Sequence, residues 1–594
     1  MARIVFFKAG EPSPLSIEVG QNSISYLTKE DYSSSLLEHG SAFYVPTIID
    51  VDSALSYNGV DLAIRIYLDC IQAGIFDIEL FLLSAEDKGS FYSHCESADI
   101  LKCPNVHFIR NSKSSIEASI ISLDIRAFKK DTALVSLRSL KITAPSVYKT
   151  HHSITNEWCI YRWTKYLGIE NVSSESGIED RLYFKHLAVI NGLNSVDGTD
   201  RLPIIPTNPN TPKPRFLLID DDVDKGWHAF FERILSKSSV VFESLGGPSF
   251  RHKTSEEIEE IAISKVQSFD PDVVILDLRL EDADFDTEKT AKEYTGIRIL
   301  KRIKQEINRG IQVIGFTASN KVWNYLEWSD SGRGIDDIVI KESPELSSNP
   351  SYTADSIIHL SSSLMTMIGR AQYLKCIDKS LKQIGSLIQS TDSSFYANEQ
   401  HNISVAYELI KQYDVDPKYI AYAYLQLFQI LEKYLKHITE WRGSDVFVLK
   451  HNGKEYRLLK YLSTNKDGKK HYESAISGQN GDFKLGKGEY DCSFVESNYI
   501  MSAVLIFLYG ESKTPGYWAN VRSVRNKKAA HPESNNVMTS EFLSLLKYLI
   551  RFFDPRSLKP RKESEALPQP APSANALGNN PVLVNLMSSM TKKP

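Results

Sequence analysis

Short apolar runs alternate with helical patterns along the first half of the chain. The runs FLLI, VVIL and VIGF have the composition of buried strands, and apolar residues between them recur at helical spacing. Strands separated by helices favour a parallel sheet, because parallel neighbours need a crossover connection. After residue 349 helical spacing dominates, with one predicted hairpin at VFVLKHNGKEYRLLKYL. The pattern predicts a multidomain protein in which α/β units precede a helical bundle.

Proline-rich segments divide this pattern into domains. The sequence PIIPTNPNTPKP at 203–214 lacks many backbone donors and favours extended structure, which is typical of a linker. The residues after 555 are rich in Pro, Ala, Ser and Asn and have few apolar anchors. We expect an N-terminal α/β domain at 1–202, the linker at 203–214, a doubly wound parallel-sheet domain at 215–348, a helical connector at 349–399, a helical domain at 400–555 and a disordered tail at 556–594.

The N-terminal domain contains no pattern typical of catalysis. No acidic cluster, glycine-rich phosphate loop or metal-ligand spacing interrupts its strand-like runs, such as AFYVPTII and IELFLLS. Two interpretations stay open: a degenerate relative of the domain that follows, and a sensory or docking domain.

Composition changes this picture little. The 69 Lys and Arg against 74 Asp and Glu give a net charge of −5, which excludes a polybasic nucleic-acid coat but permits a local basic patch. The six cysteines are scattered and form no C-x-x-C pair, which is typical of a reducing compartment. The sequence shows neither a leader pattern nor an apolar run long enough to span a bilayer. We therefore expect a cytoplasmic protein without a membrane partner.

Polar residues stand where the apolar strands of the 215–348 domain end. In an open parallel sheet the carboxyl ends of the strands meet at one crevice, so these side chains are expected to converge. The candidate residues are Asp220 and Asp221 after FLLI, Asp277 after VVIL, Thr317 after VIGF, and Lys341 after IVI.

Clustered carboxylates repel each other unless a hard divalent cation lies among them. The predicted chemistry is phosphoryl transfer to a carboxylate. In it Asp277 is the nucleophile, Asp220 and Asp221 hold Mg²⁺ together with Asp277, and Lys341 and Thr317 contact the phosphoryl oxygens. A single Asp is more simply explained as a helix cap or turn residue, and this alternative would suffice for the triplet alone. Four such strand ends in order favour the site.

The segments LLIDDD, VVILDL, VIGFTAS and GIDDIVIKES resemble the receiver domain of two-component response regulators. The resemblance implies a flavodoxin-like fold, phosphorylation at Asp277 and bound Mg²⁺, with a sensor histidine kinase or another phosphodonor protein as partner. The sequence departs from the family in a longer loop before Gly296, in Ile338 where the family usually has Tyr or Phe, and in a late Pro344. We therefore expect the chemistry to be kept and the conformational readout to differ.

A second candidate site lies in the helical domain. The sequence RNKKAAH places Arg525, Asn526 and His531 on one predicted helix, so the Arg and His side chains project toward nearly the same face. The stretch 513–528 contains five basic residues and no acidic one, which suits a nucleic-acid backbone. The simpler alternative is a solvated helix face.

This R-N-x-x-x-x-H segment, with an amphipathic helix before it and SEFLSLLKYLIRFF after it, resembles HEPN-domain proteins. The resemblance implies a ribonuclease that needs no cofactor and whose two motifs meet in a homodimer. In it His531 handles protons, Arg525 stabilises charge at phosphorus and Asn526 positions the pair. Glu432 is a candidate for a polar residue that the preceding helix directs toward the site.

These observations predict a signalling effector, in which phosphorylation of Asp277 controls an RNA-cleaving domain in bacterial stress or phage defence. The alternative is an adaptor whose helical domain only dimerises or binds a partner. A DNA-binding transcription factor is less well supported, because no recognition helix follows the receiver-like segment.

Overall fold

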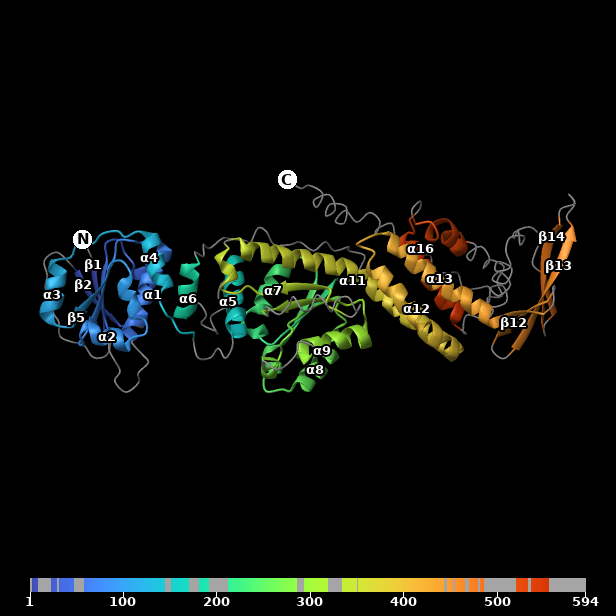
Figure 1. The fold of residues 1–594 in the computed structure, drawn as a ribbon, viewed down its shortest axis with the longest axis horizontal. Helices are drawn as coiled ribbons and strands as arrows, with labels where there is room; N and C mark the ends of the chain where they lie inside the picture. The colour runs from blue at the N-terminus through green and yellow to red at the C-terminus, as the bar shows by residue number, and fades with distance from the viewer. Residues whose placement is uncertain are drawn as a thin grey trace. The chain divides into compact units, whose positions relative to one another are not determined.

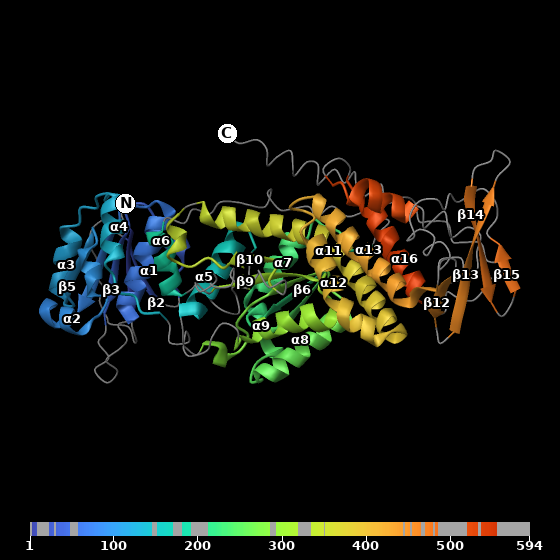
Figure 2. The same ribbon diagram turned by 45° about the vertical axis from the view of Figure 1, so that its right-hand side comes forward.

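The computed structural model describes part of the chain, and its elements are drawn in Figures 1 and 2. The described residues are 3–8, 23–28, 31–47, 58–144, 151–169, 181–191, 212–285, 293–318, 334–349, 351–442, 446–451, 454–464, 470–478, 481–484, 520–532 and 536–554. The expected linker at 203–214 lies mostly outside them, and the expected tail at 556–594 lies wholly outside them.

The N-terminal region contains a parallel sheet of five strands in the order β2-β1-β3-β4-β5. Helices α1 and α3 cover opposite faces of this sheet (Figure 1). Strand β4 is buried along its whole length, as expected for a parallel strand covered on both faces. The strands are β1 (Arg3–Lys8), β2 (Ser23–Thr28), β3 (Ala42–Pro46), β4 (Glu79–Ser84) and β5 (Val106–Arg110). The helices are α1 (Asn58–Ala73), α2 (Lys88–His94), α3 (Lys113–Ile121), α4 (Lys130–Arg138) and α6 (Leu182–Ile190).

A second parallel sheet follows, with the order β10-β9-β8-β6-β7. Numbered by position along the chain, its strands lie 2-1-3-4-5, which is also the order in the first sheet. Helix α7 lies on one side of it and α8 and α9 on the other (Figures 1 and 2). The strands are β6 (Arg215–Asp220), β7 (Val241–Gly246), β8 (Val273–Leu276), β9 (Gln312–Thr317) and β10 (Asp337–Ile340). The helices are α7 (Trp227–Leu235), α8 (Ser255–Phe269), α9 (Thr295–Arg302) and the long α11 (Tyr352–Thr391).

Helix α5 (His151–Tyr166) packs on this second sheet, although it precedes the expected linker. The ring of Trp163 contacts the rings of Trp227, Phe230 and Phe316, with centroids 5.4–6.0 Å apart. The local sequence pattern of α5 correctly predicts a helix. Its buried side chains, however, pack against the domain that begins after the expected linker.

The contacts divide the chain into two compact units. The first holds both parallel sheets and ends within α11 at Thr366, and the second holds residues 301–312 and the helices from Met367 onward. Two parallel sheets followed by a helical region confirm the predicted mixture of α/β and helical parts.

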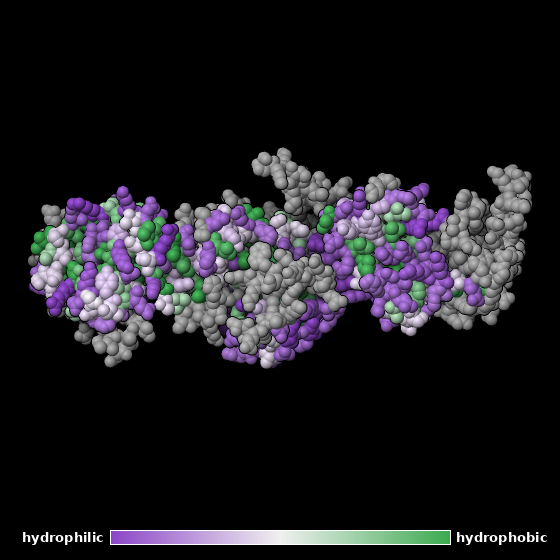
Figure 3. Space-filling model, in the orientation of Figure 1, coloured by the Kyte–Doolittle hydropathy of each residue, from purple (hydrophilic) through white to green (hydrophobic). Residues whose placement is uncertain are grey.

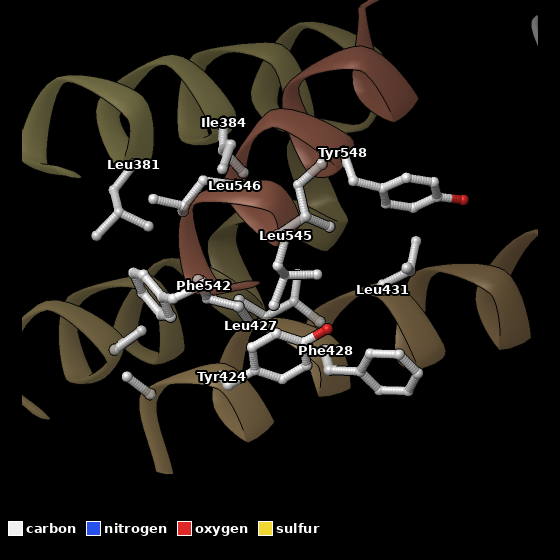
Figure 4. Close-up of a cluster of buried hydrophobic side chains, with 14 of the residues drawn as sticks. Leu381, Ile384, Tyr424, Leu427, Phe428, Leu431, Phe542, Leu545, Leu546 and Tyr548 are labelled. Carbon is white, nitrogen blue, oxygen red and sulfur yellow. The ribbon is translucent and has the colours of Figure 1, made fainter. Parts of the chain in front are cut away.

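In the second unit, the C-terminal part of α11 packs with α12 (Ser393–Lys411), α13 (Lys418–Ile438) and α16 (Thr539–Phe553). The predicted apolar stripe of α13 is buried, and Figure 4 shows Leu427 among Tyr424, Phe542 and Leu545. The visible face of these helices is mostly hydrophilic in Figure 3, as expected when their apolar faces turn to a common core.

The predicted hairpin is confirmed as β12 (Val446–His451) paired with β13 (Lys454–Thr464). It belongs to a larger antiparallel sheet that the sequence analysis did not predict, with β11 (Thr439–Arg442), β14 (Lys470–Gly478) and β15 (Gly481–Lys484). Among the helices of the described residues, none is long and apolar enough to cross a bilayer.

Replacing Leu427 with alanine should destabilise the helical bundle. The side chain is fully buried, so Leu427→Ala removes packed methyl groups and should lower the free energy of unfolding by about 2–5 kcal/mol. The free energy of unfolding is measured by urea titration, with amide exchange in α13 and α16 as the probe of the helical bundle. The control Val415→Ala alters a side chain that is 78% exposed and should change the free energy by less than about 0.5 kcal/mol. Equal effects of the two variants would contradict the assigned core.

Candidate functional site

The five residues expected at one edge of the 215–348 sheet lie at the carboxyl ends of its strands. Asp220 and Thr317 are the last residues of β6 and β9, and Asp277 and Lys341 directly follow β8 and β10. The backbone pairing continues through these ends, because Asp277 donates its N–H to Ile219 at 2.9 Å and Lys341 donates to Thr317 at 2.8 Å. The sheet itself therefore fixes where the side chains start.

Lys341 joins two of the carboxylates. Its Nζ lies 2.8 Å from Asp220 Oδ2 and 2.6 Å from Asp277 Oδ2, and all three residues are fully buried. The ammonium also lies 4.8 Å from the ring centroid of Phe316 and 5.1 Å from that of Trp227, so aromatic faces cover its remaining side. Burial lowers the pKa of Lys341, but the two carboxylates outweigh this effect and hold the pKa above its ordinary value.

The acidic triad of Asp220, Asp221 and Asp277 is compact enough to bind a metal ion. Each residue offers a carboxylate oxygen, and these oxygens lie within 4.8 Å of one another. Burial raises the pKa of Asp220 to about 7, although Lys341 opposes that shift. Burial also raises the pKa of Asp221, and the charges of its neighbours Asp222 and Asp220 add to the increase. Three hard oxygen donors with one lysine as counter-charge fit a divalent cation such as Mg²⁺.

Gly296 supports the geometry of this site by having no side chain. A Cβ at this position would lie 2.3 Å from the carbonyl oxygen of Asp277 and 2.7 Å from the Cα of Leu278. The backbone at the start of α9 therefore lies so close to the backbone of Asp277 that only glycine fits at this position.

The long loop before Gly296 is fixed at both described ends by one carboxylate. Asp284 is fully buried and accepts hydrogen bonds from the N–H groups of Leu280 and Thr295, at 3.0 and 3.2 Å. Residues 286–292 between these ends lie outside the described residues. Asp284 thus holds the two described ends of this loop next to each other.

The second candidate site brings together Arg525 and Glu432. Arg525 lies in the π-helical turn Arg525–Ala529, and its Nη2 is 3.8 Å from Glu432 Oε1 on α13. Its guanidinium also donates to Asn526 Oδ1 at 2.9 Å and lies 5.6 Å from the ring centroid of Phe428. The expectation that α13 directs a carboxylate toward the motif is confirmed.

His531 is not on the same helix as Arg525, so that prediction was wrong. The helical turn ends at Ala529, and His531 follows as an exposed residue whose N–H donates to the Lys528 carbonyl at 3.1 Å. The physical reason is Pro532, because a residue that precedes proline is disfavoured in helical conformation.

Two residues close to the acidic site were not predicted from the sequence. Asn156 of α5 hydrogen-bonds to Asp222, and Glu342, directly after Lys341, is fully buried against α5. The signal available was the aromatic-rich run WCIYRW in α5, since two tryptophans on a short helix need a large partner surface.

No family model matches the chain, and a search of curated proteins finds none similar to it.

Divalent cations should bind more tightly as pH rises. Protons compete with the cation for Asp220, and a pKa of about 7 predicts binding about tenfold tighter at pH 8 than at pH 6. Isothermal titration with Mg²⁺ at both pH values measures this change. Asp277→Asn should weaken binding at both values, whereas the exposed control Asp270→Asn should not alter it. An affinity independent of pH would contradict the assigned triad.

Proposed function

We propose that the second sheet carries a receiver domain that accepts a phosphoryl group on Asp277. The observation that carries the proposal is the buried contact of Lys341 with Asp220 and Asp277 at the carboxyl edge of a parallel sheet. The strand order 2-1-3-4-5 supports it, because this is the flavodoxin-like order, whose ligands bind at that edge.

In the proposed reaction, a carboxylate oxygen of Asp277 forms a bond to the phosphorus of an acyl phosphate or phosphohistidine donor. The bond from phosphorus to the donor breaks, and its electron pair leaves with the donor. Lys341 already pairs with Asp277 and is placed to contact phosphoryl oxygens, while Thr317 lies at the neighbouring strand end. A bound Mg²⁺ supplies positive charge that offsets the charge of those oxygens. Asp220 and Asp221, together with Asp277, would hold the cation.

We propose that the helical unit is the effector, a HEPN-like ribonuclease controlled by the receiver and active as a homodimer. Its support is the pairing of Arg525 with Glu432, with His531 exposed two residues beyond the turn that holds Arg525. Arg525 stabilises charge at the phosphodiester, Asn526 orients Arg525, and His531 transfers a proton during attack by the 2′-hydroxyl. An effector of this kind suits bacterial stress or phage defence.

We further propose that the N-terminal sheet is a receiver-like domain without a phosphoacceptor. Its strand order matches that of the second sheet, but β3, which corresponds to the strand before Asp277, ends in Pro46 and is followed by Thr47. Such a domain serves sensing or docking rather than phosphoryl transfer.

Phosphorylation should depend on Asp277. Wild-type protein incubated with Mg²⁺ and acetyl phosphate should gain one phosphoryl group, and Asp277→Asn should gain none, because the amide is not a nucleophile for phosphorus. Intact-protein mass spectrometry measures the gain. Asp270→Asn is the matched control and should react like wild type. Equal labelling of Asp277→Asn and wild type would exclude Asp277 as the acceptor.

RNA cleavage should depend on His531 and Arg525. Each alanine variant should lower the cleavage rate of bulk RNA or tRNA by about 10²-fold or more, because each removes a group that acts in the transition state. Lys379→Ala, which removes an exposed charge of α11 outside the basic stretch at 513–528, should stay within a few-fold of wild type. The rates are measured with and without acetyl phosphate, which gives the sign of control. Absence of cleavage by wild type in both states would favour the adaptor alternative.

A further inference from the structure

Helix α5 contacts the loop that follows β6. Asn156 is buried, and its Nδ2 donates a hydrogen bond to Asp222 Oδ2 while its Oδ1 accepts one from Trp227 Nε1 at 3.0 Å. Beside it, Lys225 Nζ lies 2.9 Å from Asp222 Oδ1 and 3.4 Å from Glu157 Oε1. Two adjacent residues of α5 thus hold the loop, one directly and one through Lys225.

The same helix contacts the opposite side of the acidic site through Glu342. This carboxylate is fully buried and accepts hydrogen bonds from Arg162 Nε at 3.1 Å and Trp163 Nε1 at 3.0 Å. Its N–H also lies 3.1 Å from Cys159 Sγ, where it donates. Three positions of one face of α5 therefore fix the residue that follows Lys341.

Glu342 also binds the segment that leads into α11. Its carboxylate accepts hydrogen bonds from Ser347 Oγ at 2.6 Å and from Thr353 Oγ1, in the first turn of α11, at 2.8 Å. The position of Glu342 thus links α5 to the start of the long helix.

Asp222 is one hydrogen bond away from Asp220 of the acidic triad, and Glu342 is next in sequence to Lys341, which pairs with that triad. In that hydrogen bond Asp222 donates its N–H to Asp220 Oδ1 at 2.8 Å. The ring of Trp227, which donates to Asn156, is the same ring that lies beneath the Lys341 ammonium. A shift of Asp220 or Lys341 on ligand binding would therefore act directly on residues that α5 contacts.

We propose that α5 is coupled to occupancy of the acidic site, with Asn156 as a positioning residue that holds the Asp220–Asp222 loop for cation and phosphoryl binding. The inference rests on the proposed receiver function and adds an internal element that reads the site. Thermodynamic linkage makes the coupling reciprocal: if occupancy changes the packing of α5, a change in α5 alters affinity at the site by the same factor.

The test uses the full chain with Mg²⁺ and beryllium fluoride, which stands in for the phosphoryl group. Tryptophan fluorescence gives the affinity, because Trp227 lies beside Lys341, and amide exchange is followed in residues 151–166 and in strands β6 and β8. Asn156→Asp keeps the acceptor for Trp227 but places a carboxylate against Asp222. It should weaken binding about fivefold or more and abolish the exchange response of α5.

Two further variants separate coupling from misfolding. Glu157→Gln removes the ion pair of α5 with Lys225, which keeps its contact with Asp222, and should weaken binding in the same direction by a smaller factor. Lys165→Ala changes an exposed residue of the same helix and should behave like wild type. Unchanged affinity in both Asn156→Asp and Glu157→Gln, with protected strand ends and an unresponsive α5, would overturn the inference and leave the receiver function standing. If wild-type β6 and β8 gain no protection, the proposed receiver function fails and the inference fails with it.

Discussion

A lysine ammonium buried between two carboxylates is the interaction on which the second sheet's chemistry depends. Removing charges from water is costly, and Lys341 compensates Asp220 and Asp277 only because the backbone of four parallel strands brings their ends together. Burial, with a smaller contribution from the neighbouring carboxylates, raises the pKa of Asp220 to about 7 although Lys341 opposes the shift, and one lysine faces three carboxylates at this edge. An excess of buried negative charge is the physical basis for cation binding at this edge.

Glu342, the residue after Lys341, makes its contacts on the other side of the backbone, against α5. Successive side chains at the end of a strand point to opposite faces, so Lys341 faces the carboxylates while Glu342 faces α5. Each charge is matched on its own side: the ammonium by two carboxylates, and the Glu342 carboxylate by an arginine, an indole and two hydroxyls. One short segment of backbone therefore joins two separate groups of charge-paired side chains. In this arrangement of the described residues, α5 contacts the residue after Lys341 and not Asp277 itself.

The sequence was sufficient for the parts of the structure that local pattern controls. Apolar strands ending in polar residues predicted where Asp220, Asp277 and Lys341 lie, and helical spacing predicted the buried face of α13. The sequence was insufficient where a residue packs against residues far from it along the chain. The pattern of α5 predicts a helix but not which core it joins, and that assignment depends on Trp163 meeting Trp227. The antiparallel sheet around the predicted hairpin was missed because strands such as KHYESAISG alternate too weakly to be recognised alone.

The two parallel sheets have the same strand order, so the first sheet can serve as a control for the second in the same molecule. One sheet ends in a cluster of charges that desolvation opposes, and the other has the same topology with neutral or basic residues at its strand ends. A change in solvent or salt that affects the stability of this topology should affect both sheets, because their strand order is the same. A response confined to the second sheet can therefore be assigned to the charge cluster rather than to the fold, within a single molecule and under identical conditions.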